Sequence, residues 1–510
     1  MFIRKKQNKS GSISVQIIDT SGKTNRLVKT IGSTKNQNQL KELLKEAHSF
    51  VTGYRNQEEL EFSYKEDEKF LETLKTGLRN ISMVGPDLIL GKLYDEIGFN
   101  EIEEELFKEL VISRIVFPLS KLKTSEYLLR YKNKRLEVDK IYRYLDKLES
   151  KQKSQVEQIS FNHTLKLFKG NLSIVFYDVT TIYFESSDED DLRKTGFSKD
   201  GKHQSPQIIL GLLVSIDGYP LAYEVFEGNK FEGHTMIPVI ESFKKKYDLK
   251  KLVIIADAAM LSKKNVAELI EKDYEFILGG RIKNESDQIK NKILSHHFSN
   301  GQSILIKRDE NTKLIVNYSL SRAKKDAQNR QKGLKKLEKL LEKQRLTKKH
   351  LNNRGYNKYL KIDGTVKITI DYEKFKADSH WDGLKGYITN SEISKEEVIE
   401  NYKHLWQIEK AFRISKTDLK VRPIYHRLPK RISAHFTIAF CAYKIYKELE
   451  RQLKIKNSKI SAARAIELMK TIYSFRIKLP ESAKETNLIF AEQDEQIYLL
   501  NLFGLDYLLD

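Results

Sequence analysis

The stretch Leu172-Ser-Ile-Val-Phe-Tyr177-Asp178 is a short apolar run that ends in an aspartate. A second run of the same design, Leu252-Val-Ile-Ile-Ala256-Asp257, follows further along the chain. Runs of this length that are rich in β-branched and aromatic residues are typical of buried strands. The two runs therefore predict two core strands, each of which ends in a carboxylate.

The segments around these runs predict further strands and helices. The predicted elements are, in order, a strand at 172–178, a hairpin at 207–226 that turns at Asp217-Gly218, a helix at 235–246, a strand at 252–257, a Ser262-capped helix at 262–272 and a strand at 274–278. Three strands followed by alternating helices and strands favour an α/β fold with a mixed sheet.

The size and composition of the chain limit the class of protein. With 510 residues the chain is long enough for about three domains of roughly 150 residues each. Hydrophobic residues make up 40% of the sequence, which is enough apolar surface to exclude disorder as the main state. Lys and Arg outnumber Asp and Glu by 91 to 70, for a net charge of +21, so we expect a polyanionic partner, nucleic acid first.

Cysteine content and hydropathy bear on the compartment. The single cysteine, Cys441, excludes an internal disulfide and a cysteine-rich zinc site. The longest apolar stretches, 208–216 and 436–443, are shorter than the roughly 18 residues that a membrane span requires, and the basic residues 1–10 do not begin a signal peptide. We predict a cytoplasmic protein with no membrane partner.

The N-terminal residues combine a strand pattern with helical patterns. Alternating apolar residues at 13–17 and again at 27–31 predict a small hairpin, and the apolar spacing becomes helical from about residue 38. A basic, mainly helical region of this size is a candidate DNA reader. A helical packing module fits the same residues equally well, because no recognition helix can be identified in one sequence.

A second basic segment lies in the middle of the chain. Residues 322–354 hold 13 Lys or Arg against three acids, and leucines between 334 and 341 form a narrow apolar stripe. The pattern predicts a basic amphipathic helix. Such a helix either binds phosphates or is a solvated helix with one packed edge.

The two strand-end aspartates are candidates for chemistry. Asp178 and Asp257 each continue the apolar face of a predicted strand, where an unpaired carboxylate is costly. A metal ion would supply the missing partner, and ligands of open α/β sheets bind where strands give way to loops. The alternative is that each aspartate caps a loop or the following helix.

A third acid lies on a helix predicted at 395–416. On a helical wheel Glu409 lies in the middle of the apolar stripe, with Leu405 and Phe412 on one side and Trp406 on the other. Tyr402 and Lys416 lie seven residues to either side, about 10.5 Å away along the same face. This face could follow a nucleic-acid backbone. A buried ion pair, or a helix tilted so that Glu409 reaches water, would explain the same pattern.

Asp178, Asp257 and Glu409 together form a set of hard oxygen ligands for Mg²⁺ or Mn²⁺. Two such ions about 4 Å apart can activate a water or a 3′-hydroxyl and stabilise the leaving oxygen of a phosphodiester. Strands in this order with acids at these points indicate an RNase H-like mixed-sheet core of the nucleotidyl-transferase type.

Several short motifs recur in an order that resembles one known family. They are Tyr177-Asp178-Val-Thr180-Thr181, Gly196-Phe-Ser198-Lys199-Asp200, residues 207–213, Gly228-Asn229 with Glu232 and Thr235, residues 256–262, Asp382-Gly383 followed by Ile388-Thr389-Asn390, and Arg422-Pro423. The segment Tyr402-Lys-His-Leu-Trp-Gln-Ile-Glu409-Lys-Ala-Phe-Arg-Ile-Ser-Lys416 resembles the Tyr-x2-Arg-x3-Glu-x6-Lys signature. The chain is thus similar to DDE transposases of bacterial insertion sequences, the group whose core is split by an insertion.

The resemblance implies roles for individual residues. It implies that Asp178, Asp257 and Glu409 are catalytic and bind two Mg²⁺ or Mn²⁺ ions, and that Tyr402 and Lys416 contact phosphates near the cleavage site. The signature arginine is replaced by Leu405, which puts its phosphate contact in doubt, and Arg413 lies on the same face as a substitute.

The resemblance also implies a division of the chain. The expected regions are an N-terminal DNA-binding region at 1–165 with a small hairpin and then helices, the first part of the RNase H-like core at 166–283, an insertion with the basic helix at 284–381, the second part of the core at 382–450, and a helical region at 451–510 that is a candidate for dimerisation.

Two further features are open to more than one interpretation. Trp381 and Trp406 are candidates for stacking on an extruded base, although the position of Trp406 beside Glu409 favours a place in the core. Gly279-Gly280 follows a predicted strand and is interpreted as a turn.

The sequence therefore predicts a nucleoid-associated bacterial transposase that binds the terminal inverted repeats of its element as a homodimer, cleaves there and joins the ends to target DNA. Two alternatives stay open: a DNA-binding protein derived from such an enzyme and no longer catalytic, and a metal-dependent nuclease that does not rejoin strands.

Overall fold

The computed structural model describes residues 1–22, 24–197, 201, 204–249, 251–343, 346–347, 350–352, 355–363, 367–479 and 482–509. Contacts within the chain define two units. The first comprises Met1–Ser82 and Tyr473–Phe490, with Leu509, and the second comprises Met83–Ile472 and Ala491–Leu508. The five-part division expected from the sequence stays a prediction.

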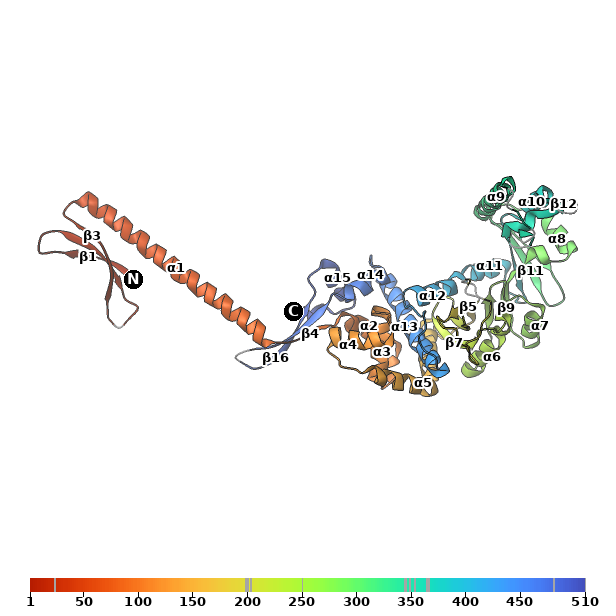
Figure 1. Ribbon diagram of the computed structural model, residues 1–510, viewed down its shortest axis with the longest axis horizontal. Coiled ribbons are helices and arrows are strands. Elements are labelled where there is room, and N and C mark those ends of the chain that lie inside the picture. Colours follow the sequence, from red (N-terminus) through yellow and green to blue (C-terminus); the bar gives the residue numbers. More distant parts are fainter. Residues whose placement is uncertain are drawn as a thin grey trace. The chain divides into compact units, whose positions relative to one another are not determined.

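The first unit begins with a three-stranded antiparallel sheet. Its strands are β1 (Phe2–Gln7), β2 (Ile13–Asp19) and β3 (Arg26–Thr34), with β2 in the middle. The predicted hairpin corresponds to β2 and β3. The sequence did not predict β1, because Arg4, Lys5 and Lys6 interrupt any apolar alternation. The long helix α1 (Gln37–Gly77) begins at Asn36, whose side chain caps it, and packs on one face of the sheet (Figure 1).

A second small sheet in this unit joins distant parts of the chain. Strand β15 (Tyr473–Lys478) lies between β16 (Glu485–Phe490) and β4 (Leu78–Met83). The expectation that residues 451–510 are helical is therefore wrong for 473–478 and 485–490. Strand β15 does alternate Tyr473, Phe475 and Ile477 with polar residues, a signal that the sequence analysis missed, whereas the mostly exposed β16 carries little apolar alternation.

Helices form one part of the second unit. They are α2 (Gly85–Ile97), α3 (Glu105–Val116), α4 (Lys121–Lys132), α5 (Val138–Leu167), α13 (Pro429–Ile455), α14 (Ala462–Met469) and α15 (Asp494–Leu502). Helix α13 is buried over most of its length and contacts α5, α3 and α2, so it lies at the centre of this group. Ser120 caps α4, where its side chain accepts a hydrogen bond from the backbone N–H of Lys123.

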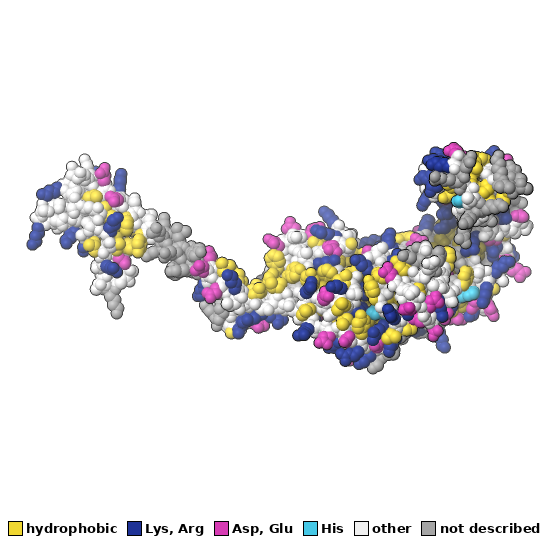
Figure 2. All heavy atoms as spheres, in the orientation of Figure 1, with side chains coloured by type: hydrophobic (Ala, Val, Ile, Leu, Met, Phe, Trp, Pro, Cys, Tyr) yellow, Lys and Arg dark blue, Asp and Glu magenta, His cyan; other side chains and the backbone are white. Residues whose placement is uncertain are grey.

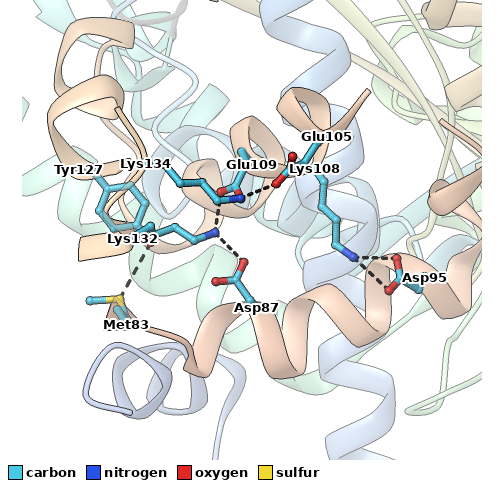
Figure 3. A network of polar contacts seen from close by, with 9 residues as sticks. All are labelled: Met83, Asp87, Asp95, Glu105, Lys108, Glu109, Tyr127, Lys132 and Lys134. Carbon is cyan, nitrogen blue, oxygen red and sulfur yellow. Dashed lines mark hydrogen bonds and ion pairs between the residues drawn. The ribbon is translucent and has the colours of Figure 1, made fainter. Parts of the chain in front are cut away.

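Ion pairs join the first three of these helices (Figure 3). The ammonium of Lys132 lies 2.6 Å from a carboxylate oxygen of Asp87 on α2 and 2.5 Å from one of Glu109 on α3. The Lys132 side chain is only 7% exposed. Removal of the Lys132 charge would leave Asp87 without this partner and Glu109 with Lys134 alone, so the contact fixes how α2, α3 and α4 pack.

An eight-stranded mixed sheet forms the other part of the second unit. Its strands are, in spatial order, β10 (Ser303–Lys307), β11 (Lys313–Tyr318), β14 (Leu384–Thr389), β9 (Glu275–Gly280), β8 (Val253–Ala256), β5 (Ile174–Tyr183), β6 (Gln207–Ser215) and β7 (Pro220–Glu227). Strand β8 runs parallel to β5 and β9, and the other pairs are antiparallel. The predicted α/β class, the hairpin and the mixed sheet are confirmed.

Helices cover both faces of this sheet. Helices α6 (Met236–Tyr247) and α7 (Lys263–Glu271) pack on the face that carries Tyr177, with Phe243 and Leu269 in the shared core. Helix α12 (Trp406–Thr417) contacts β5 and β6. Its Phe412 lines a small cavity with Leu212, whose partner in the sheet is Asp178, so α12 lies on the aspartate's face.

The predicted insertion at 284–381 is not a single body separate from the sheet. It begins with α8 (Asp287–Leu294), and β10 and β11 then extend the central sheet. Helix α9 (Leu320–Glu342), β12 (Leu360–Asp363), β13 (Lys367–Ile370) and α10 (Tyr372–Asp378) follow, with a small core of their own formed by Leu334, Leu337, Tyr359 and Ile370. The predicted basic helix at 322–354 corresponds to α9, and residues 344–345, 348–349 and 353–354 lie outside the described residues.

Among the described residues, every helix is too short or too polar to cross a bilayer.

Candidate active site at the carboxyl ends of β5 and β8

The two aspartates lie side by side in the sheet. Strand β5 pairs in parallel with β8, and Tyr177 stands opposite Ala256. The next position in the same register brings Asp178 beside Asp257. Neighbouring strands are about 4.8 Å apart, and residues in register point to the same side of a sheet. The fold therefore places both carboxylates at one point of one face.

The two aspartates differ in their local structure. Asp257 directly follows β8, and its side chain accepts a hydrogen bond from the backbone N–H of Ala259 at 2.8 Å. Asp178 was predicted to close its strand, but β5 continues to Tyr183 because Val179–Tyr183 pair with β6. Both aspartates are half-buried, so solvent reaches this point of the sheet.

The single helix predicted at 395–416 is wrong. Helix α11 (Lys395–Lys403) ends before His404, and α12 begins at Trp406. Tyr402 and Glu409 therefore belong to different helices and do not share one straight face with Lys416. The buried side of α12 consists of Ile408, Ala411, Phe412 and Ile414. Glu409 is exposed at the edge of this side rather than in its middle, and Lys416 is half-buried.

Tyr402 of α11 packs against the sheet at Gly279, beside the aspartates. It is 6% exposed, and a Cβ added to Gly279 would lie 2.5 Å from its hydroxyl oxygen. Leu278 stands opposite Ala256, so Gly279 continues the row that contains Asp257. Gly279 is thus part of β9. The interpretation of Gly279-Gly280 as a turn is wrong. Its missing side chain makes room for Tyr402 next to the carboxylates.

The charges around Tyr402 come from all three candidate acids. Burial raises the pKa of the Tyr402 hydroxyl well above its ordinary value, and the negative charges of Asp257, Glu409 and Asp178 raise this pKa further. The hydroxyl therefore stays protonated as a hydrogen-bond donor at neutral pH. The same charges show that Glu409 lies within electrostatic range of the aspartates' side of the sheet.

Two cations lie at this site: Lys385, which the sequence analysis missed, and Arg322, the first basic residue of the segment 322–354. The ammonium of Lys385 on β14 lies 4.4 Å from the centre of the Tyr402 ring. Burial and then Arg322 lower the pKa of Lys385, while Glu409 acts in the opposite direction. Lys385 and Tyr387 are two residues apart in β14, so their side chains lie on the same side of the strand. This spacing, after the Asp382-Gly383 motif, is the sequence feature that points to Lys385.

The residues expected to contact DNA occupy different environments. Leu405, at the position of the signature arginine, is 8% exposed, and Arg413 is exposed on α12. Trp406 was expected to lie in the core, but it is 50% exposed because the break before α12 turns it outward. Trp381 packs against the core of the sheet. It lines a cavity of about 700 Å³ together with Arg322 and Lys385.

The donor types at the site suit a hard divalent cation, because carboxylate oxygens are the ligands that Mg²⁺ and Mn²⁺ prefer. Asp178 and Asp257 are brought together. Within the described ranges, however, no three His, Cys, Asp or Glu side chains form a ready-made metal cluster. Glu409 would complete a ligand set only by moving toward the aspartates. The motif residues Ser198, Lys199 and Asp200 lie outside the described residues.

Comparison with known proteins identifies the family to which this chain belongs. Residues 169–445 match the family model described as the transposase DDE domain. The match covers more than half of the chain, so the chain belongs to the DDE transposase family. Enzymes of this family generally use divalent metal ions. No curated protein matches the chain.

Solved structures of other transposases show a distant likeness. A piggyBac transposase synaptic complex with hairpin DNA is 10% identical, with 83% of this chain and 82% of that chain covered and a TM-score of 0.37. A Mos1 transposase paired-end complex with the left transposon end is 11% identical, with 31% of this chain and 53% of that chain covered and a TM-score of 0.16.

Proposed function

We propose that this protein is the transposase of a bacterial insertion sequence, which binds the terminal inverted repeats of its element, cleaves DNA there and joins the freed ends to target DNA. One observation carries the proposal: Asp178 and Asp257 occupy neighbouring positions on parallel strands inside the residues that match the transposase DDE domain. The family membership supplies the reaction, and this pair of aspartates supplies the site.

The topology supports an RNase H-like core. Strands β5, β6 and β7 form an antiparallel meander, and β8 and β9 follow α6 and α7 on the other side of β5. Along the chain these elements follow the order that the sequence pattern suggested for a nucleotidyl-transferase core, three strands and then alternating helices and strands. The third acid then arrives on α12, after the strands and helices of the predicted insertion.

Asp178, Asp257 and Glu409 would hold the divalent ions in this proposal. When bound, two such ions supply Lewis-acid activation of the attacking oxygen and stabilise the leaving oxygen. Hydrolysis breaks the bond to the 3′ oxygen, which leaves with a proton as the 3′-hydroxyl, while water provides the new oxygen of the 5′-phosphate. In strand transfer that 3′-hydroxyl attacks a target phosphodiester, and another 3′ oxygen leaves.

The neighbouring side chains position the DNA backbone. The Tyr402 hydroxyl donates a hydrogen bond, and Lys385 and Arg322 provide positive charge beside Glu409. These two cations would take the role of the signature arginine, whose position is occupied by Leu405 in this chain. Lys416 and Arg413 extend the contact along α12, and Trp381 lies where an unstacked base would find an aromatic surface.

The proposal includes a dimer. Two ends of one element must be held together before both are joined to one target, so we expect two copies of the chain in the complex with DNA.

Cleavage of a short duplex that carries the element's terminal repeat tests this function. We expect cleaved and joined products with Mg²⁺ or Mn²⁺, and a loss of roughly 1000-fold or more in Asp178→Asn, Asp257→Asn and Glu409→Gln. The control is Glu400→Gln, an exposed acid of α11 that pairs with Lys403 and should leave the rate unchanged. Binding without cleavage by the wild type would indicate an inactive DNA-binding derivative, and cleavage without joined products would indicate a nuclease.

A further inference from the structure

The N-terminal sheet of the first unit has an apolar face covered by α1 and an opposite, outer face that carries both polar and apolar side chains. Val15 and Ile17 of β2 point toward α1, together with Ala47 of that helix. The register then assigns the alternate residues to the outer face. They form three rows across β1, β2 and β3: Phe2, Ile18 and Leu27; Arg4, Gln16 and Thr30; Lys6, Ser14 and Ser33.

Side-chain contacts agree with this assignment. The guanidinium of Arg4 donates to the side-chain oxygen of Gln16 at 2.7 and 3.2 Å. The hydroxyl oxygens of Ser14 and Ser33 lie 2.6 Å apart. Each contact joins two neighbours of the same row. Two of the three outer rows therefore form an ordered polar surface, whereas the row of Phe2, Ile18 and Leu27 is apolar and its Ile18 is only 2% exposed.

The N-terminal sheet region is strongly basic. Residues 1–36 contain eight Lys or Arg and a single acid, Asp19, for a net charge of +7. The three outer rows contain Arg4 and Lys6 and no acid, and both cations are exposed. Figure 2 shows Lys and Arg side chains over this part of the molecule. Because Arg4 is bonded to a neutral amide, its charge remains available to an anion.

The dimensions of the sheet fit a nucleic-acid groove. Three strands at about 4.8 Å spacing span roughly 10 Å from the first to the third. The major groove of B-DNA is about 12 Å wide and admits an α-helix or a two-stranded ribbon, and several proteins read it with strands. Arg and Gln are the residue types that make bidentate contacts with guanine and adenine edges, and Ser and Thr accept either.

We propose that the outer face of the β1–β2–β3 sheet binds double-stranded DNA in the major groove, with Arg4 and Gln16 toward base edges and Lys6 on a phosphate. This surface lies outside the residues that match the transposase domain. It assigns DNA reading in the N-terminal region to a sheet, whereas the sequence had pointed to helices. The inference rests on the proposed function only for the nature of its partner, duplex DNA.

Fluorescence anisotropy with the full-length protein tests the surface. The probes are a labelled duplex of the element's terminal repeat, a duplex of scrambled sequence and a single strand. We expect Arg4→Ala/Lys6→Ala to weaken binding to the terminal repeat at least about 10-fold, and to reduce the slope of log Kd against log salt by about 2. Gln16→Ala should narrow the difference between repeat and scrambled duplex.

A matched variant separates this surface from the general charge of the protein. Lys5→Ala/Lys45→Ala removes the same charge, but Lys5 lies on the α1 side of β1 and Lys45 on α1 itself, and both are exposed. This variant should bind nearly as the wild type does. Circular dichroism melting checks that both variants are folded.

Equal affinities and salt slopes for the two double variants would overturn the inference, as would a preference of the outer face for the single strand. Neither result bears on the acids, because cleavage that depends on Asp178 would still support the proposed function. Conversely, if the wild type binds the duplex through Arg4 and Lys6 but does not cleave it, the proposed function fails while this inference holds.

Discussion

At the scale of single residues, Lys385 has an unusual position for a lysine. It lies beside the ring of Tyr402 and within range of Glu409, and its partial burial lowers its pKa. A cation that is partly desolvated binds a phosphate more strongly than one in bulk water. We therefore expect Lys385 to bind a phosphate of the DNA backbone, a contact that the uncharged Leu405 cannot make.

We expect Lys385→Ala to slow DNA cleavage by about 10- to 100-fold, which corresponds to the loss of one charge-assisted contact. Lys385→Arg should restore most of the rate, since the charge is kept. Single-turnover kinetics at saturating DNA measure the effect, with Lys361→Ala, an exposed lysine of β12, as the control. A rate for Lys385→Ala equal to that of the control would remove Lys385 from the site.

Gly279 is the second residue on which the site depends. A Cβ at this position would meet the Tyr402 hydroxyl at 2.5 Å and the backbone nitrogen of Ala258 at 3.0 Å. Gly279→Ala should displace Tyr402 or the turn after Asp257, and we expect cleavage to fall at least about 10-fold in a folded protein. Gly91→Ala, whose Cβ would meet the side chains of Lys108 and Ile112 at 3.5 Å or more, is the control. Unchanged cleavage by Gly279→Ala would show that the close packing is not required.

At the scale of elements, the strands of the core were predictable because burial on both faces forces continuous apolar runs, as at 172–177 and 252–256. Asp178 and Asp257 stood out because each carboxylate follows such an apolar run, although only Asp257 lies at the end of its strand. The break between α11 and α12 was not. His404 and Leu405 keep right-handed helical dihedral angles, and no Pro or Gly marks the turn, so a helical wheel runs through it.

The cations of the site illustrate a different limit. Lys385 and Arg322 come from segments far from Asp178 and Asp257 in the sequence, and only the pairing of β14 with β9 and β11 brings them near. A single sequence carries no signal of such pairing. Strand β1 was missed because its charged outer face replaces the usual apolar alternation.

The packing of α2, α3 and α4 gives a prediction at this scale (Figure 3). Lys132→Ala leaves Asp87 without its partner and Glu109 with Lys134 alone, so we expect a loss of about 3 kcal/mol in the free energy of unfolding. Lys108→Ala breaks a solvent-exposed pair with Asp95 and should cost less than about 1 kcal/mol. Urea denaturation compares the two variants, and equal losses would contradict this account of the helix packing.

At the scale of the whole molecule, buried histidines make stability depend on pH. Burial lowers the pKa of His163 to about 4 and that of His426 to about 4, and it lowers the pKa of His435 well below its ordinary value. Nearby cations, Lys444 for His163 and Lys121 for His426, lower these values further. In the folded protein these side chains are neutral at a pH where the unfolded chain binds protons.

The sign of the effect follows from this difference. Above about pH 6.5 neither state binds the protons, and the full stability is present. As the pH falls from 6.5 toward 4, the unfolded state gains protons first, so each histidine removes about 1.4 kcal/mol of unfolding free energy per pH unit. Urea denaturation at several pH values should show this slope, and His426→Gln should reduce it. An identical slope in that variant would contradict the assignment.

The central claim, that Asp178 is a ligand of catalytic metal ions, is tested most directly by a change of metal preference. A thiolate is a softer ligand than a carboxylate, so Asp178→Cys should lose cleavage in Mg²⁺ and regain part of it in Mn²⁺, which accepts softer ligands more readily. The protein's own cysteine, Cys441, is fully buried in α13 and does not compete. The account predicts inactivity in Mg²⁺ with rescue by Mn²⁺. Full activity of Asp178→Cys in Mg²⁺, or a ratio of cleavage rates in Mn²⁺ and Mg²⁺ no higher than that of Glu400→Cys, would contradict it.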